Sequence, residues 1–171
     1  MVNQCVICGR EMPEGNQVCN MCIGKMTIHF EPSDILNIVL DDGAKMPNRA
    51  HKTDAGLDLY SRETKIIPAK GSAIFDTGVH IQLPPNTTGF LKSKSGLNVK
   101  YGITSEGVID CGFCGSIVAK LYNHSGKDYK VKKGDKITQL VILPILTPEL
   151  NLVTEFEETE RGNGGFGSSG R

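Results

Sequence analysis

Residues 107–115, Gly-Val-Ile-Asp-Cys-Gly-Phe-Cys-Gly, are the stretch from which the rest of the chain is best interpreted. Two apolar residues lead into a single carboxylate, Asp110, and a glycine follows at Gly112. The pattern predicts a tight β-hairpin, because glycine adopts the positive φ that such turns need. An Asp at the tip of a hairpin can simply form the turn, since its side chain caps the local backbone. Taken alone, the stretch favours that structural role for Asp110.

Short apolar runs alternate with turn residues over most of the remaining chain. The sequence contains 20 glycines and 8 prolines, and no long segment has the 3.6-residue periodicity of a helix. This pattern predicts an all-β fold, either a barrel or a jelly roll. The runs that we expect to form strands are residues 34–40, 57–60, 65–67, 73–75, 79–83, 89–91, 117–122 and 137–145.

The charge balance excludes some classes of protein. Lys and Arg together number 19, as do Asp and Glu, so the chain lacks the basic excess typical of proteins that bind nucleic acids or membranes. No segment is long and apolar enough for a transmembrane span, and the N-terminus does not resemble a secretory signal. We therefore expect a cytoplasmic protein in a reducing compartment, with no membrane partner and no nucleic acid required for activity.

The first 24 residues contain four cysteines in two pairs. Cys5 and Cys8 form one pair and Cys19 and Cys22 the other, and each pair encloses two residues. Four thiolates in this arrangement suit a closed, tetrahedral and structural Zn²⁺ site. We expect residues 1–24 to form a zinc-ribbon-like module, with redox-active or idle cysteines as the alternative, and residues 25–35 to form a linker. The sequence does not identify a partner for the module.

Two stretches before Asp110 place polar groups among the expected strands. Asp58 interrupts the apolar run of residues 55–61, and a carboxylate in such a place pairs with a cation or binds a metal, directly or through water. Residues 92–97, Lys-Ser-Lys-Ser-Gly-Leu, offer two ammonium groups, two hydroxyls and a glycine. These groups suit phosphate binding, although a solvated loop has the same composition.

Two further stretches follow Asp110. Gln139 alternates with apolar residues in the segment 133–140, which predicts a turn and then a strand. The chain ends in a Gly-rich segment, residues 161–171, that carries Arg161, Phe166 and the hydroxyls of Ser168 and Ser169. Such a tail is either disordered or a clamp that orders over a ligand, with Arg for phosphate and Phe for stacking.

The order and spacing of these five stretches resemble the five motifs of the trimeric deoxyuridine triphosphatase (dUTPase) family, over residues 36–171. The resemblance implies a jelly-roll-like β core at residues 36–158 and a tail at residues 159–171 that closes over the active site. It also implies a homotrimer whose sites draw residues from all three chains. The family hydrolyses dUTP to dUMP and pyrophosphate, which limits uracil in DNA and supplies dUMP for thymidylate synthesis.

The resemblance also implies a role for individual residues. Asp110 falls at the position of the catalytic carboxylate, which activates a water for attack on the α-phosphate. Asp58 and Gln139 are expected to reach a substrate-bound Mg²⁺ through water. The expected substrate-binding residues are Lys94, Ser95, Gly96, Thr104, Gly107, Ile109, Phe113, Gln139, Arg161, Phe166, Gly167, Ser168 and Ser169. Among these, main-chain groups of residues 104–109 would read uracil, Phe113 would screen the sugar and Phe166 would stack on the base.

Four positions depart from the family pattern or are not explained by it. Lys94 stands where the family usually has Arg, and Phe113 stands where it has Tyr, which removes a hydroxyl but keeps the ring. The family pattern does not explain Cys111 and Cys114, for which packing is the simplest interpretation. Two other functions stay open, namely an inactive scaffold for protein interaction and a deoxycytidine triphosphate deaminase on the same fold. The complete motif set argues against both.

Overall fold

The structure is a computed structural model that describes residues 3–4, 11–12, 35–159 and 162. In chain order, its elements are β1 (Asn3–Gln4), β2 (Glu11–Met12), β3 (Asn37–Leu40), β4 (Gly56–Tyr60), β5 (Lys65–Ile67), β6 (Ser72–Asp76), β7 (Val79–Gln82), β8 (Thr87–Lys92), α2 (Ser95–Tyr101), β9 (Ile103–Ile109), β10 (Val118–Asn123), β11 (Tyr129–Val131) and β12 (Lys136–Pro144). The described part of the chain is therefore mostly β, as the sequence predicts.

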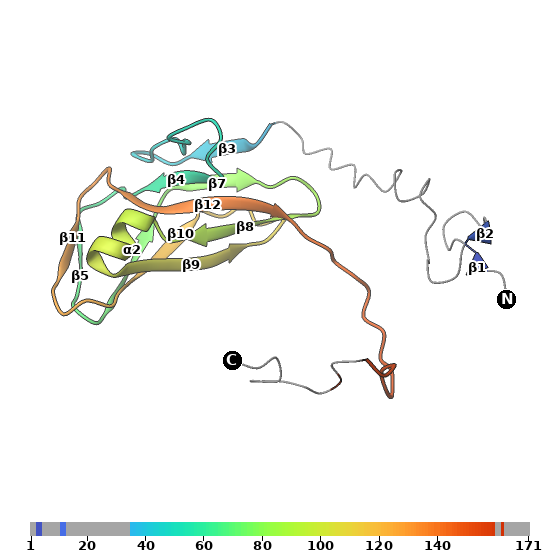
Figure 1. Cartoon of the computed structure of the whole chain (residues 1–171). Coiled ribbons are helices and arrows are strands. Elements are labelled where there is room, and N and C mark those ends of the chain that lie inside the picture. The colour runs from blue at the N-terminus through green and yellow to red at the C-terminus, as the bar shows by residue number, and fades with distance from the viewer. Residues whose placement is uncertain (1–2, 5–10, 13–34, 160–161, 163–171) are drawn as a thin grey trace.

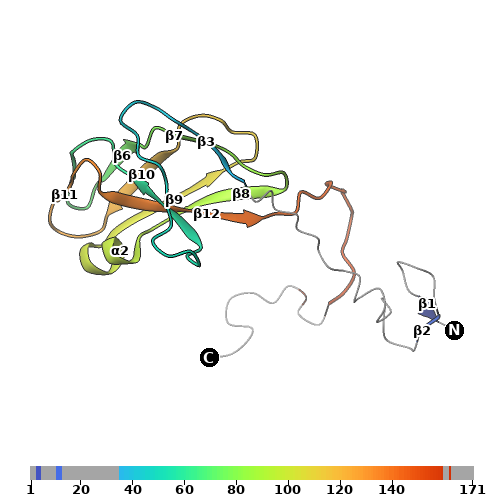
Figure 2. The same ribbon diagram turned by 90° about the horizontal axis from the view of Figure 1, so that it is seen from above.

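The largest sheet has six strands in the order β4-β12-β8-β9-β10-β6, and every pairing in it is antiparallel. The last strand, β12, pairs with both β4 and β8, so it lies between two strands that come earlier in the chain (Figure 1). Two smaller antiparallel pairs, β3–β7 and β5–β11, complete the main body, and Figure 2 shows it from above. A separate short pair joins β1 and β2.

One hydrophobic core joins the large sheet to the two smaller pairs. It forms because alternate residues of the strands point inward, as on β10, where Ala119 and Leu121 are buried between exposed neighbours. Fully buried side chains come from most of the strands and include Leu59, Ile67, Phe75, Val79, Leu91, Ile103, Ile117, Leu121, Val131, Ile137 and Leu140. This continuous core holds in place the strands that carry Asp58 and Gln139 and the strands that lead to Lys94 and Asp110.

The structure adds a helix that the sequence pattern did not predict. Residues 95–97 belong to α2, which extends to Tyr101 and ends at Gly102 with a φ of 65°. Because α2 is short and has no buried residue, it leaves no apolar periodicity in the sequence. Among the described residues, no helix has the length and apolar character needed to cross a membrane.

The predicted tight hairpin at residues 107–115 is wrong in one respect. The turn is present, since the Phe113 N–H donates to the Asp110 carbonyl at 3.1 Å and Gly112 has a φ of 93°. However, β9 ends at Ile109 and β10 begins only at Val118, so residues 110–117 form a wide connection. The β9–β10 ladder covers Ile103 to Ser105 alone, whereas Glu106 to Ile109 pair with β8 on the other edge of β9. Asp110 therefore begins a loop and does not sit at the tip of a two-stranded ribbon.

Candidate active site

Asp58, Gln139 and Lys92 lie side by side in the large sheet. Asp58 on β4 is opposite Gln139 on β12, and Gln139 is opposite Lys92 on β8. Directly opposite residues in antiparallel strands are close neighbours, so the pairing of three strands brings together three of the stretches singled out in the sequence.

Asp58 is buried, with 3% of its surface exposed, and it is paired with two cations. Its Oδ1 accepts a hydrogen bond from Lys94 Nζ, and its Oδ2 lies 2.7 Å from Lys136 Nζ. Burial acts to raise the pKa of Asp58, but the hydrogen bonds and charges of the two lysines outweigh it and hold that pKa below 3.8. The Asp58 carboxylate is therefore ionised at neutral pH and shared by two ammonium groups.

Gln139 depends on the absence of a side chain at Gly56. A Cβ built at Gly56 would lie 2.4 Å from Gln139 Oε1, which is too close for any real contact. In the space that Gly56 leaves, the Gln139 side chain turns so that its Nε2 donates to the Ser93 carbonyl at 3.0 Å. Gly56, in the stretch 55–61, thus positions Gln139, in the stretch 133–140.

A buried hydrogen-bond chain connects these residues to β9. Ser105 Oγ donates to Thr138 Oγ1 at 2.7 Å, and Thr138 Oγ1 donates to the Lys92 carbonyl at 3.0 Å. Ser93 and Ser105 are joined twice, through the Ser93 hydroxyl and the Ser105 main chain. Since Ser105 and Thr138 are fully buried, this network fixes the segment before α2 relative to the strand that leads to Asp110.

The residues around the start of α2 present an open surface. Lys94 immediately precedes the helix, and Ser95 and Gly96 are its first two residues, both exposed. A Cβ built at Gly96 would meet no atom within 4 Å, so the backbone is accessible to a ligand there. The arrangement is compatible with the phosphate-binding role expected for this stretch, next to the Asp58–Lys94 pair.

The expected base-reading segment lies on β9. Thr104 Oγ1 lies 2.8 Å from His124 Nε2, and Ile109 is buried. Because the β9–β10 ladder stops at Ser105, the residues from Glu106 to Ile109, which include Gly107, pair with β8 on one side only. In the described part of the chain, this half of β9 has a strand edge that no β10 residue covers.

Asp110 and Phe113 are exposed in the loop that follows β9. The Phe113 ring covers Gly115, since a Cβ built there would lie 2.6 Å from Phe113 Cζ. Cys111 Sγ lies 3.6 Å from the Pro84 carbonyl, Cys114 Sγ lies 3.6 Å from the Gly112 carbonyl, and both cysteines are free thiols. The described residues contain no cluster of three or more His, Cys, Asp or Glu able to hold a metal.

One chain does not bring Asp58 and Asp110 together. Asp110 lies four residues along the chain from Glu106, which is opposite Lys92. At about 3.3 Å per residue, this offset is about 13 Å along β9. Across the sheet, β4 is three strand spacings from β9, or about 14 Å. The two carboxylates of one chain are therefore well separated, both along the strands and across the sheet.

Sequence reasoning missed Lys136, the second cation on Asp58. Lys136 lies at the start of β12, where the pairing with β4 shifts register between Lys136 and Thr138. A bulge of this kind leaves no clear signal in the sequence, because it depends on the pairing of two distant strands. The expected zinc ligands Cys5, Cys8, Cys19 and Cys22 lie outside the described residues, as do the expected tail residues Arg161, Phe166, Gly167, Ser168 and Ser169.

Comparison with known proteins identifies the family. A family model described as dUTPase matches residues 42–170. The chain belongs to the dUTPase family. A deoxyuridine 5'-triphosphate nucleotidohydrolase of Clostridium acetobutylicum is 46% identical over 134 residues, which cover 77% of this chain and 92% of the relative. One of Paramecium bursaria Chlorella virus 1 is 43% identical, covering 81% and 99%.

Solved dUTPase structures have the same fold. A variant of the Staphylococcus bacteriophage 80alpha dUTPase with dUpNHpp aligns with a TM-score of 0.73 at 35% identity, covering 81% of this chain and 99% of that one. A dUTPase variant from phage phi11 of S. aureus aligns with a TM-score of 0.68 at 33% identity, covering 73% and 100%, and its description names a coordinated structural Mg(II) ion.

Proposed function

We propose that the chain hydrolyses dUTP to dUMP and pyrophosphate, and so lowers dUTP and supplies dUMP. The observation that carries the proposal is the identity with named deoxyuridine 5'-triphosphate nucleotidohydrolases, which extends over nearly their whole length. The chemistry of the candidate site agrees with it. An exposed carboxylate follows a half-paired strand, and a separate surface offers cations and open backbone for phosphates. A deaminase or an inactive scaffold does not account for the complete set of motif residues.

Asp110 is the proposed general base. An exposed Asp carboxylate accepts a proton from a water that it orients, and the positioning supplies most of its effect. The water attacks the α-phosphorus and pyrophosphate departs. The loop between β9 and β10 holds Asp110 next to Phe113, whose ring is expected to lie against the deoxyribose and to exclude a 2′-hydroxyl. Uracil is expected to pair with main-chain groups along the uncovered edge of β9, where cytosine would present a mismatched amino group.

The phosphate site is proposed at the start of α2, with Lys94, Ser95 and Gly96, and with Gln139 nearby. Arg161, Ser168, Ser169 and Gly167 would complete it from the tail, and Phe166 would stack on the base. When bound, Mg²⁺ neutralises the phosphate charge and favours departure of pyrophosphate. The described residues contain no cluster of three or more His, Cys, Asp or Glu, which fits an ion held by the substrate phosphates and by waters, since Mg²⁺ needs few direct protein ligands.

We propose a homotrimer with a jelly-roll-like subunit and composite active sites. The separation of Asp58 and Asp110 on the surface of one chain supports this proposal. Within a monomer, the two carboxylates are too far apart to act on one bound triphosphate. A cyclic trimer would place the Asp110 loop of one chain against the Asp58 surface of its neighbour. We further propose that residues 36–158 form the core and that the tail, residues 159–171, closes the site. The protein is proposed to act in the cytoplasm.

A pyrophosphate-release assay with dUTP, dCTP, dTTP and UTP tests the activity. The wild type should prefer dUTP, and Asp110→Asn should lower kcat by a factor of about 10² to 10⁴, the usual contribution of a general base. Asp42→Asn, which alters an exposed carboxylate in the turn after β3, is the matched control and should retain full activity. Absence of a dUTP preference, or full activity of Asp110→Asn, would contradict the proposal.

We propose that residues 1–24 bind one structural Zn²⁺ through Cys5, Cys8, Cys19 and Cys22, with residues 25–35 as a linker. The paired cysteine spacing supports this reading, because four thiolates complete a tetrahedral site. Metal analysis of the purified protein should give one zinc per chain, and replacement of Cys5 and Cys8 by Ser should abolish it. Deletion of residues 1–24 should leave dUTP turnover intact. A zinc content well below one per chain would contradict the proposed zinc site.

A further inference from the structure

Both ring nitrogens of His80 face oxygen atoms that can only accept hydrogen bonds. His80 lies on β7, with its Nδ1 at 2.9 Å from the Cys114 carbonyl and its Nε2 at 3.1 Å from Asp41 Oδ1. A neutral imidazole has one N–H and one lone pair, so it can satisfy only one of these oxygens. The geometry therefore requires an imidazolium that donates at both nitrogens.

The surroundings of His80 favour the same charge state. The hydrogen bond to the Cys114 carbonyl is the main cause that raises the pKa of His80 above 6.5. Burial acts in the opposite direction, and the Asp41 and Asp76 carboxylates add to the increase. The charged and titratable groups around the ring are Asp41 after β3, Arg62 after β4, Asp76 on β6 and the Cys114 thiol.

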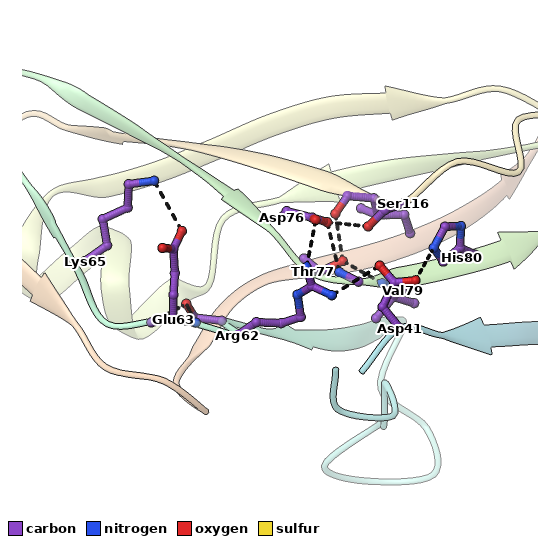
Figure 3. A network of polar contacts seen from close by, with 12 residues as sticks. Asp41, Arg62, Glu63, Lys65, Asp76, Thr77, Val79, His80 and Ser116 are labelled. Carbon is purple, nitrogen blue, oxygen red and sulfur yellow. Dashed lines mark hydrogen bonds and ion pairs between the residues drawn. The ribbon is translucent and has the colours of Figure 1, made fainter. Parts of the chain in front are cut away.

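His80 is one end of a continuous network of ion pairs (Figure 3). Arg62 bridges the two carboxylates, with Nη1 at 3.1 Å from Asp41 Oδ2 and Nη2 at 3.0 Å from Asp76 Oδ2. Ser116 Oγ in turn donates to Asp76 Oδ1. With His80 protonated, two cations balance two carboxylates, whereas a neutral ring leaves one negative charge in excess.

This network holds the loop that carries Asp110 and Phe113. The loop, residues 110–117, is bound to it at Cys114 through His80 and at Ser116 through Asp76. Its last residue, Ile117, is fixed by main-chain hydrogen bonds to Thr77, in the turn after β6, and to Val79, the first residue of β7. Of these attachment points, Cys114 is the nearest to Phe113. Among the described contacts, the Cys114 carbonyl is held by the His80 side chain alone.

We propose that His80 is a positioning residue which, as an imidazolium, clamps the Cys114 carbonyl and so sets the position of Asp110 and Phe113. The inference rests on the proposed dUTP hydrolysis. When the pH rises through the pKa of His80, the ring loses a proton. The remaining proton stays on Nε2, which faces the charged Asp41 carboxylate, so Nδ1 presents a lone pair to the Cys114 carbonyl. The clamp then opens. Its contribution to stability is complete below about 6.5, the ordinary pKa, and is lost as the pH rises through the higher folded value.

The test compares kcat and KM for dUTP and UTP between about pH 6 and pH 9 in the wild type, His80→Gln and His51→Gln. Glutamine does not titrate and cannot donate from two opposite nitrogens. We expect His80→Gln to lower kcat about tenfold at neutral pH, because misplacement of a catalytic group by about 1 Å is costly. It should also reduce the preference for dUTP over UTP and remove the alkaline fall in kcat that we expect of the wild type. His51, whose side chain is 81% exposed and pairs with Asp54, is the matched control and should behave as wild type.

The charge state of His80 can also be measured in the wild type, so this test does not depend on whether the His80→Gln variant folds. Nitrogen-15 NMR of the His80 ring should show two N–H groups at pH 6, and the amide signals of residues 111–115 should titrate with the same pKa as the ring. In Asp41→Asn, the ring should titrate at lower pH, and the alkaline limb of kcat should move with it.

Three outcomes would overturn the inference: a neutral His80 ring at pH 6, loop amides that do not follow the ring, or wild-type kinetics in His80→Gln. A wild type that does not turn over dUTP would contradict the proposed function instead. If the wild type is active and His80→Gln has the same kcat and KM, only the positioning role of His80 is contradicted. The two failures are therefore distinguishable.

Discussion

Asp58 illustrates how a single residue serves both the fold and the candidate site. Its carboxylate is buried and ion-paired with Lys94 and Lys136, which lie in different segments of the chain. Removal of one partner from such a cluster leaves charges without compensation. The same pairing holds Lys94 in front of α2, where a phosphate is expected to bind.

Asp58→Asn should therefore destabilise the protein at neutral pH, because two ammonium groups would face each other without a carboxylate. Since the pKa of Asp58 is lowered in the folded state, its contribution is present above about 3.8 and is lost as the pH falls through the folded value. Urea unfolding of both proteins at several pH values checks this. The gap between the two midpoints should be widest near neutral pH and should narrow in acid. A constant gap, or none, would contradict the pairing seen here, and Asp42→Asn provides the control.

At the scale of elements, β12 organises the candidate site. It carries Thr138 and Gln139 and pairs with both β4 and β8. It therefore brings residues of the stretches 55–61, 92–97 and 133–140 into one row of the sheet. The hydrogen-bond chain through Thr138 and Ser105 extends this order to β9. Strand pairing and buried hydroxyls, more than loop flexibility, therefore determine where the polar groups lie.

Gly56→Ala tests this arrangement at the contact between β4 and β12. The new Cβ would overlap Gln139 Oε1, so the glutamine side chain must move away from Ser93. We expect a loss of about 1–3 kcal/mol in unfolding free energy, as for overpacking in general, and lower turnover of dUTP. Gly126→Ala is the matched control, because its Cβ would enter open space and its φ is not positive. Equal effects of the two substitutions in thermal melts and kinetics would refute the proposed role of Gly56.

At the scale of the whole molecule, the surface of one chain separates the two halves of the proposed chemistry. Asp110 lies beyond the end of β9 that pairs with Gly89, and Asp58 and Gln139 lie in the row of Lys92. The composite site that we propose would therefore form only where two chains meet.

Mixing experiments test this requirement. Asp110→Asn and Gln139→Ala chains are each expected to be impaired. If every site takes Asp110 from one chain and Gln139 from another, chains that are unfolded together in equal amounts and refolded should contain about one quarter of intact sites by random assembly. Turnover should recover to about that fraction of the wild-type value. No recovery would show that both residues act from one chain, and size-exclusion chromatography would confirm that mixed assemblies formed.

The sequence by itself determined the local features. Alternating apolar runs with Gly and Pro between them predict most strands of the main body, because inward and outward residues must alternate in a half-buried strand. The order of short motifs indicated the dUTPase family, and it marked Asp58, Asp110 and Gln139 before any contact was known. These features depend on neighbouring residues in the chain, so the sequence is sufficient to reveal them.

Only the tertiary structure decided which distant residues meet. The second lysine on Asp58, the dependence of Gln139 on Gly56 and the His80 clamp on Cys114 all follow from the register of strands far apart in the chain. The wide loop after Ile109 follows from the early end of the β9–β10 ladder at Ser105. Such contacts arise from the packing of one shared core, whose geometry depends on all strands at once, and no local pattern specifies them.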